Sequence, residues 1–178
     1  MKYSIALTSA IENYLRVENL QFAFDNDKGR FLYEANLSWR LQVCKGRITV
    51  RENDIIIRFV SPFVIPEEKR NDVSEYLMRA NYARMTGAFE MDYSDGEFAF
   101  RNALFCGCSM PDEETIKFAI QTAKSALDEF GDGVVDIISG NSSPVQALEE
   151  VERKQDERLN ALQELQDAFQ SLMDALEA

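Results

Sequence analysis

The spacing of apolar residues changes along the chain from helical to strand-like and back. Leu7, Ile11, Tyr14 and Leu15 fall on one face of a helix, which predicts a first helix from about Ser4 to Val17. From Leu20 to Phe59 apolar and polar residues alternate, as in half-buried strands. The alternating residues include Phe22, Phe24, Phe31, Tyr33, Ala35, Leu37, Trp39, Leu41 and Val43. This region predicts an antiparallel meander with one buried face.

Polar residues, glycine and proline interrupt the alternation and predict the turns. Asn26–Gly29, Lys45-Gly46 and Glu52–Asp54 are expected to separate successive strands. Pro62 and Pro66 are expected to end the sheet, with Pro66 well suited to the first turn of a helix.

A second helix is predicted after Pro66, followed by a tight hairpin. The apolar face of this helix comprises Val73, Tyr76, Leu77 and Ala80. Its dipole is expected to be complemented by Glu67 and Glu68 at the start and by Arg79 and Arg84 at the end. The hairpin alternates Phe89, Met91 and Tyr93, turns at Asp95-Gly96 and returns through Phe98, Phe100 and Leu104.

The residues from Ser109 to Glu114 predict the start of a third helix. Its apolar stripe runs to Phe130, and Gly131-Asp132-Gly133 is expected to stop it before a short apolar segment, Val134 to Ile138. The stretch from Gly140 to Pro144 is expected to separate a domain at 1–140 from an acidic amphipathic helix at 144–178.

The predicted last helix carries two heptad seams. One holds Val151, Arg158, Leu165 and Leu172, and the other holds Leu148, Gln155, Leu162, Phe169 and Leu176. Leu162, Leu165, Phe169, Leu172 and Leu176 are the candidate partner interface, because one helix cannot bury this face alone. Packing back on its own domain, pairing with a second copy and binding another protein are the alternatives.

Composition and charge narrow the classes of partner. The chain has a net charge of −12, of which residues 143–178 contribute half through nine acidic and three basic residues. Such a surface repels phosphate backbones and anionic lipids, so neither nucleic acid nor membrane is expected as a partner. Without an apolar run of spanning length or a signal-peptide core, the sequence predicts a cytoplasmic protein.

The chain contains no histidine, which excludes Ser-His-Asp and Cys-His catalysis and histidine metal sites. Cys106-Gly107-Cys108 is the one close cysteine pair, and only Cys44 could supplement it, so structural thiols are favoured over a zinc site. We therefore expect no metal and no cofactor.

Two carboxylate clusters have turn chemistry as their simplest explanation. Asp92, Asp95 and Glu97 surround the hairpin turn, where acid–base catalysis is disfavoured by exposure. Asp25–Gly29 resembles the start of a calcium loop but has Asn36 where an EF-hand needs glutamate. No catalytic residue is predicted. Tyr33, Trp39 and Phe59 could line a recognition surface, although core positions are more typical of aromatics at strand spacing.

The central part of the chain resembles the YbjN family, whose members are described as bacterial sensory transduction regulators. The residues that carry the resemblance are Pro62, Pro66-Glu67-Glu68-Lys69-Arg70, Asn81-Tyr82, Gly87, Phe89, Asp92, Asp95-Gly96, Arg101 and Pro111-Asp112-Glu113-Glu114. The resemblance covers about residues 5–140 and is most specific in 62–115. The helix after Gly140 is additional to the family pattern.

The resemblance implies the α+β fold of type III secretion chaperones: an antiparallel sheet flanked by helices in the order α-β(meander)-α-β-β-α, here with a C-terminal helix. It implies a protein-binding fold, typically dimeric, without catalytic residues. We expect a non-catalytic bacterial binding protein, chaperone-like or regulatory, that is a homodimer with an unidentified protein partner. The alternatives are an oligomerisation protein assembled through its last helix and an enzyme using carboxylate or cysteine chemistry.

Overall fold

The computed structural model describes residues 3–38, 40–82, 84–107 and 109–177, with side chains described as far as Asp174. Its helices are α1 (Ile5–Val17), the 3₁₀ helix η1 (Glu67–Lys69), α2 (Arg70–Tyr82), α3 (Glu113–Ser139) and α4 (Pro144–Glu177). Its strands are β1 (Phe22–Asp25), β2 (Arg30–Asn36), β3 (Val43–Val50), β4 (Asp54–Val64), β5 (Ala88–Met91) and β6 (Glu97–Phe105). The predicted α+β order is confirmed.

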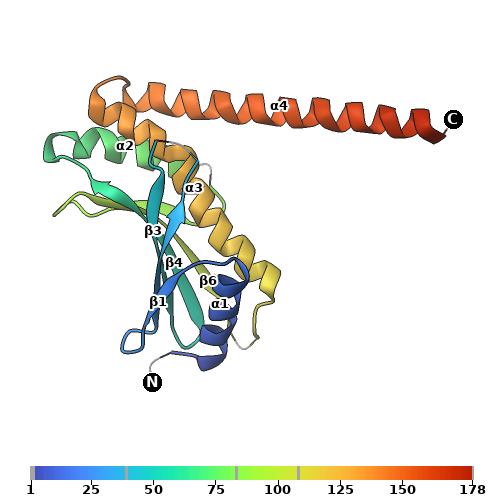
Figure 1. Cartoon of the computed structure of the whole chain (residues 1–178). Coiled ribbons are helices and arrows are strands. Elements are labelled where there is room, and N and C mark those ends of the chain that lie inside the picture. Colours follow the sequence, from blue (N-terminus) through green and yellow to red (C-terminus); the bar gives the residue numbers. More distant parts are fainter. Residues whose placement is uncertain (1–2, 39, 83, 108, 178) are drawn as a thin grey trace.

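The strands form one antiparallel sheet in the order β1-β2-β3-β4-β6-β5. Phe31, Ile48, Ile57 and Phe100 lie on its buried face, and each is at most 1% exposed. Helices α1 and α3 run beside one another along the sheet, and α2 lies at the end from which α4 departs (Figure 1). The opposite face of the sheet presents polar side chains between its apolar residues.

The first helix follows the predicted pattern closely. Ser4 caps it, since its Oγ accepts a hydrogen bond from the Leu7 N–H at 3.3 Å. The predicted face is buried, with Leu7, Ile11, Tyr14 and Leu15 at most 5% exposed.

The predicted turn at Lys45-Gly46 is wrong. Both residues lie within β3, where Gly46 is paired with Tyr33 on one side and Phe59 on the other. A Cβ atom at Gly46 would overlap the Tyr33 ring, which packs edge-on against Phe59. The glycine therefore makes room for an aromatic side chain in the core, and the connection lies between β2 and β3.

Pro62 does not end the sheet, because β4 continues to Val64. The pairing of β4 with β6 shifts between Val60 and Val64, so Pro62 falls in an irregular part of the strand. Pro66 precedes η1, and α2 follows with the predicted buried face. Arg84 lies beyond the last turn of α2, with its guanidinium 4.6 Å from the centre of the Phe130 ring.

The predicted helix stop at Gly131-Asp132-Gly133 is also wrong. Helix α3 passes through both glycines and ends at Gly140, whose φ of 76° forms a left-handed cap. A Cβ atom at Gly131 would overlap the Leu41 side chain, and one at Gly133 would overlap the Tyr76 hydroxyl. These glycines allow close packing against α3.

Side chains of α2 donate hydrogen bonds to backbone carbonyls of Ile65 and of the β5–β6 hairpin. Arg70 donates from Nε to the Ile65 carbonyl at 3.3 Å and from Nη1 to the Tyr93 carbonyl at 2.7 Å. Asn81 donates to the Phe89 carbonyl at 3.0 Å. Gly96, at φ 84°, accepts from the Ile65 N–H at 2.8 Å. The residues that carry the family resemblance thus build the scaffold.

Candidate functional site

Helix α4 begins as part of the globular body and continues as a freestanding arm (Figure 1). Ser143 and Gln146 cap its start reciprocally, with the Ser143 N–H donating to Gln146 Oε1 at 3.0 Å. Ala147 and Val151 are 3% and 4% exposed where α4 contacts α2 and α3. The first turns are therefore anchored by core packing.

Every side chain from Asp156 to Asp174, here called the distal segment, is exposed. The predicted interface residues Leu162, Leu165, Phe169 and Leu172 are 63%, 68%, 62% and 58% exposed. The Leu176 side chain lies outside the described part of the chain. We call these five residues the apolar stripe. The packing-back alternative holds for the first turns of α4 and does not extend to the distal segment.

A polar interruption of the heptad seam lies where the helix leaves the body. The heptad seam continues through the point of departure, with Gln155 and Arg158 as its polar positions. In the structure, Gln155 is the last partly buried residue before the distal segment. The polar pair on the seam therefore coincides with the start of the arm.

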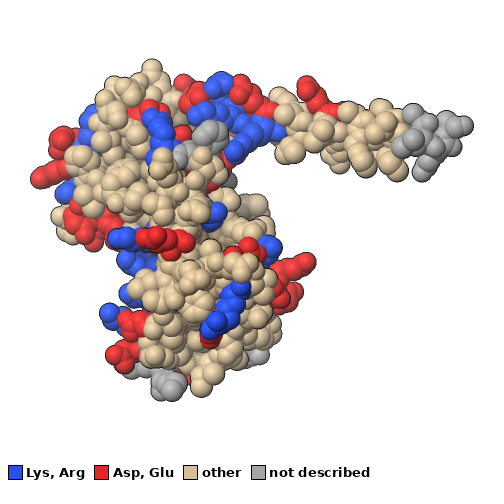
Figure 2. Space-filling model, viewed as in Figure 1, with Lys and Arg blue, Asp and Glu red and all other residues tan. Residues whose placement is uncertain are grey.

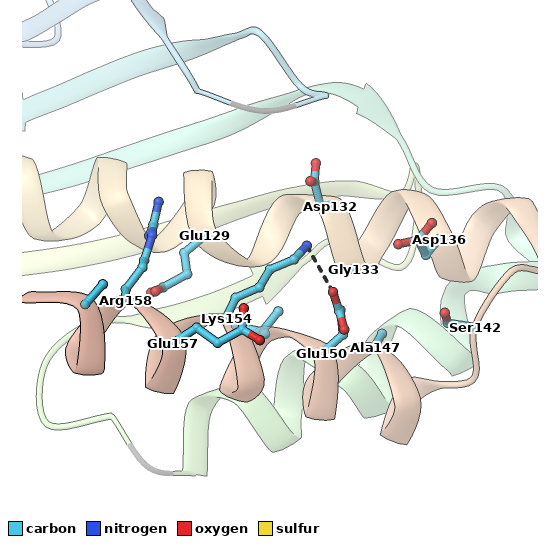
Figure 3. A pocket seen from close by; sticks show the side chains of 12 residues that line it. Glu129, Asp132, Gly133, Asp136, Ser142, Ala147, Glu150, Lys154, Glu157 and Arg158 are labelled. Atoms are coloured by element: carbon cyan, nitrogen blue, oxygen red, sulfur yellow. Dashed lines mark ion pairs between the residues drawn. The ribbon is translucent and has the colours of Figure 1, made fainter.

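A hollow of about 330 Å³ lies between α3 and the base of α4 (Figure 3). Gly133, Ala147, Val151 and Ala161 supply its small and apolar lining. Its carboxylates are those of Glu129, Asp132, Asp136, Glu150 and Glu157. The Nζ of Lys154 lies 3.4 Å from Glu150 Oε1 within this hollow.

Two carboxylates of the hollow hold the β2–β3 connection. Arg40 Nη2 donates to Asp136 Oδ2 at 2.7 Å, and Arg40 Nη1 donates to Asp136 Oδ1 at 2.9 Å. The Arg40 N–H donates to Asp132 Oδ1 at 3.2 Å. Hydrogen bonding from Arg40 holds the pKa of Asp136 below its usual range. A carboxylate of lowered pKa is a poor general acid, and Asp136 here anchors the β2–β3 connection.

Three arginines lie side by side on the open face of the sheet. Arg47, Arg58 and Arg101 are cross-strand neighbours on β3, β4 and β6. Arg58 Nε lies 2.6 Å from Glu90 Oε1, and Arg101 Nε lies 2.9 Å from Glu90 Oε2. Like charges directly opposite one another destabilise a sheet. The carboxylate of Glu90, which lies between Arg58 and Arg101, offsets this repulsion. Glu97 Oε2 lies 3.9 Å from Arg47 Nη2.

The two carboxylate clusters considered as candidate sites lie in turns. Asp92 accepts hydrogen bonds from the N–H and hydroxyl of Ser94, which lower its pKa, and Asp95 accepts from the Glu97 N–H at 2.8 Å. Asp25 accepts from the N–H groups of Asp27 and Lys28 in its own turn. These contacts confirm that turn chemistry explains both carboxylate clusters.

Tyr33 and Phe59 are 6% and 1% exposed, so the core reading of these aromatics is confirmed, and Trp39 lies outside the described residues. Cys44 and Cys106 are buried free thiols, and Cys108 is likewise outside the described part of the chain. Within the described ranges, no three His, Cys, Asp or Glu residues are grouped as metal ligands would be. No helix in those ranges has an apolar run of membrane-spanning length.

Comparison with known proteins assigns the fold to a family. The family model named YbjN, described as "Putative bacterial sensory transduction regulator", matches residues 8–135. No curated protein matches the chain.

Solved structures similar to it include the following two. The crystal structure of YbjN from E. coli, described as "a putative transcription regulator", shares 9% identity at a TM-score of 0.51, covering 75% of this chain and 90% of that one. An uncharacterized protein from Methanothermobacter thermautotrophicus shares 15% identity at a TM-score of 0.48, covering 75% of this chain and 96% of that one. The match of the family model, which extends over most of the chain and stops before α4, shows that this protein belongs to the YbjN family.

Proposed function

We propose that this YbjN-family protein is a non-catalytic protein-binding module, chaperone-like or regulatory, that contacts its partner through the apolar stripe of α4. The observation that carries the proposal is the 58–68% exposure of Leu162, Leu165, Phe169 and Leu172 on a helix whose first turns are firmly packed. Contiguous apolar surface of this kind marks protein interaction sites. The family description as a regulator agrees with a binding role.

The chemistry of the described side chains supports binding rather than turnover. Burial raises the pKa of the Cys44 thiol to about 12, and burial likewise raises the pKa of Cys106. A raised pKa leaves little thiolate at neutral pH, so neither sulfur is activated as a nucleophile. Asp132, Asp136 and Glu150 of the hollow are engaged in hydrogen bonds or ion pairs, as is Asp92 of the hairpin turn.

Net charge guides the choice of partner. At −12, the chain repels polyanions, so a protein is favoured over nucleic acid or an anionic membrane. An apolar helix face is recognised by the apolar face of another helix or by an apolar groove. A cytoplasmic location belongs to the same proposal.

A matched pair of variants tests the proposed function. Leu162→Glu/Phe169→Glu places two charges on the apolar stripe, whereas Gln163→Glu/Gln170→Glu adds the same charges to other exposed positions of the distal segment. Tagged wild type and the glutamine control should recover the same proteins from a cell extract, including an untagged second copy. The stripe variant should lose them, and recovery of the same proteins by all three chains would contradict the proposal.

A further inference from the structure

We propose that a cleft between α1, β2 and α3 binds a small carboxylate with an apolar body, of about the size of benzoate. None of the described residues that line this cleft belongs to α4, so the site is separate from the apolar stripe. A buried hydroxyl in its wall, that of Tyr33, is the observation from which the site is inferred.

The cleft has a volume of about 180 Å³ and lies where the end of α1 meets α3 over the sheet. The two helices run beside one another there (Figure 1). Its lining includes apolar side chains from Leu20, Phe59 and Ile120 and polar side chains from Tyr33, Gln121 and Lys124. An apolar surface with a few convergent polar groups is typical of a small-molecule site.

The hydroxyl of Tyr33 is buried without a hydrogen-bond partner among the described residues. The residue is 6% exposed, and no described side chain or backbone group forms a hydrogen bond with its hydroxyl oxygen. Buried polar groups in proteins are nearly always paired, because an unpaired one destabilises the fold. The equally buried Tyr76 follows this rule, since its hydroxyl donates to the Phe130 carbonyl at 2.9 Å. The Tyr33 hydroxyl is therefore a donor for a group that enters the cleft.

Gly46 directs the Tyr33 ring toward the cleft. Tyr33, Gly46 and Phe59 are cross-strand neighbours on β2, β3 and β4. Because Gly46 has no Cβ, the Tyr33 ring extends over β3 and meets Phe59 edge-on, with the ring centres 6.0 Å apart. Burial, followed by the neighbouring Tyr14, raises the pKa of Tyr33. Since Phe59 and Tyr14 both line the cleft, the hydroxyl faces it and stays protonated as a donor.

Lys124 supplies a positive charge at the same cleft. Glu18 is the one carboxylate in the described lining, and its Oε1 lies 3.2 Å from the Nζ of Lys117, which is outside that lining. Asp128, one turn beyond Lys124 on α3, accepts a hydrogen bond from the Ser38 N–H at 2.7 Å. Both neighbouring carboxylates thus contact other groups, and the ammonium of Lys124 can pair with an anion in the cleft.

Charge on the outer surface is less selective. On the face shown in Figure 2, the acidic and basic side chains of the globular body are interspersed. The whole chain carries a net charge of −12, so it repels a small anion at long range. A hydroxyl donor and a cation in a partly apolar cleft overcome this repulsion locally, because electrostatic attraction is stronger where water is excluded.

The size and chemistry of the cleft define the class of ligand. Since an apolar cavity of about 150 Å³ holds benzene, about 180 Å³ suits one ring, or a chain of about six carbons, with a carboxylate. The carboxylate can accept from the Tyr33 hydroxyl and pair with Lys124. Its apolar body then lies against the wall of Leu20, Phe59 and Ile120. A charged acceptor forms the stronger hydrogen bonds, so a carboxylate is favoured over an amide of the same shape.

Titration of the full chain with benzoate and with hexanoate tests this site. Binding is measured from chemical-shift changes in protein NMR spectra and from the rise in melting temperature, at constant ionic strength. Both carboxylates should bind. Benzamide has the same size without the charge and should bind about tenfold more weakly than benzoate.

Two variants with matched controls locate the bound carboxylate. Tyr33→Phe removes the hydroxyl but keeps the ring, and Lys124→Met removes the charge, so each should weaken benzoate binding about tenfold. Tyr82→Phe and Lys28→Met make the same changes at exposed positions and should bind benzoate as the unsubstituted chain does. Because the Tyr33 hydroxyl is unpaired in the fold, Tyr33→Phe should keep the melting temperature of the ligand-free chain.

Weaker binding of benzoate by both Tyr33→Phe and Lys124→Met, with the controls unchanged, supports the proposed site. Unchanged binding by either of these two variants would overturn it, as would benzamide binding as tightly as benzoate. If neither benzoate nor hexanoate binds, water alone satisfies the Tyr33 hydroxyl and the carboxylate site is overturned. These outcomes leave the apolar stripe to the recovery experiment, which tests the proposed function separately.

Discussion

The side chain of Asn81 holds the backbone of Phe89 from both sides. Its Oδ1 accepts from the Phe89 N–H at 2.7 Å, and its Nδ2 donates to the Phe89 carbonyl at 3.0 Å. The last turn of α2 is thereby fastened to the start of β5.

Replacing Asn81 by alanine should lower the free energy of unfolding by about 2 kcal/mol, because two partly buried backbone groups lose their partners. Urea unfolding measures the loss. Asn160→Ala, on the exposed arm, is the matched control and should change stability by less than about 0.5 kcal/mol. Equal effects of the two substitutions would refute the role given to Asn81.

Gly133→Ala should destabilise the fold by about 1–3 kcal/mol, although alanine normally stabilises a helix interior. The new methyl would overlap Tyr76, which is fully buried and whose hydroxyl donates to the Phe130 carbonyl at 2.9 Å. Gly131→Ala meets the end of the flexible Leu41 side chain and should cost less. Thermal unfolding compares the two, and a larger loss at Gly131 would contradict this account.

The positions where sequence reasoning failed share one physical cause. Local sequence predicts a turn or a helix end at Gly46, Gly131 and Gly133. In the structure each of these glycines packs against an aromatic or aliphatic side chain from a distant part of the chain. Local propensity could not reveal contacts with Tyr33, Leu41 and Tyr76. Helical spacing, by contrast, predicted the buried faces of α1 and α2 residue by residue, because the period of burial is a local property.

The sequence predicts which residues form the candidate site but not how they are placed relative to the rest of the fold. Heptad spacing identifies the apolar stripe, and the structure adds that every side chain from Asp156 to Asp174 is exposed. That exposure depends on where α2 and α3 end relative to α4, which no local pattern encodes. The row of Arg47, Arg58 and Arg101 was missed because it requires the strand register, although the residues stand at alternating positions of predicted strands.

Glu90→Gln should lower the free energy of unfolding by about 1 kcal/mol, because Arg58 and Arg101 lose the carboxylate they share. The effect should shrink in high salt. Glu75→Gln removes the i,i+4 partner of Arg79 on the exposed face of α2. It should lower the free energy of unfolding by less than about 0.5 kcal/mol. Urea unfolding at low and high salt separates the two, and a salt-independent loss at Glu90 would argue against the charge explanation.

Stability should fall as the pH rises above about 10. Burial, followed by the charge of Glu18, raises the pKa of Tyr14 to about 12, and burial also raises the pKa values of Tyr33 and Tyr76. A tyrosine whose pKa is raised in the fold stabilises it fully below pH 10. That contribution is lost between pH 10 and 12, because the unfolded state ionises first.

Each buried tyrosine should contribute about 1 kcal/mol to the stability lost by pH 11. Tyr14→Phe should therefore reduce the loss between pH 8 and 11, measured by chemical unfolding at each pH. Tyr82→Phe, at a side chain that is 95% exposed, serves as the control. An unchanged loss in Tyr14→Phe would show that alkaline instability has another source.

The most direct test of the binding surface on α4 is the solution mass of the full chain across a range of concentrations, beside that of Leu162→Glu/Phe169→Glu. If the apolar stripe joins two copies, wild type should approach twice its 20.3 kDa mass, and the stripe variant should remain at 20.3 kDa with unchanged helix content. A wild-type chain that stays at 20.3 kDa at every concentration, or a variant that associates as strongly, would contradict the joining of two copies through the apolar stripe.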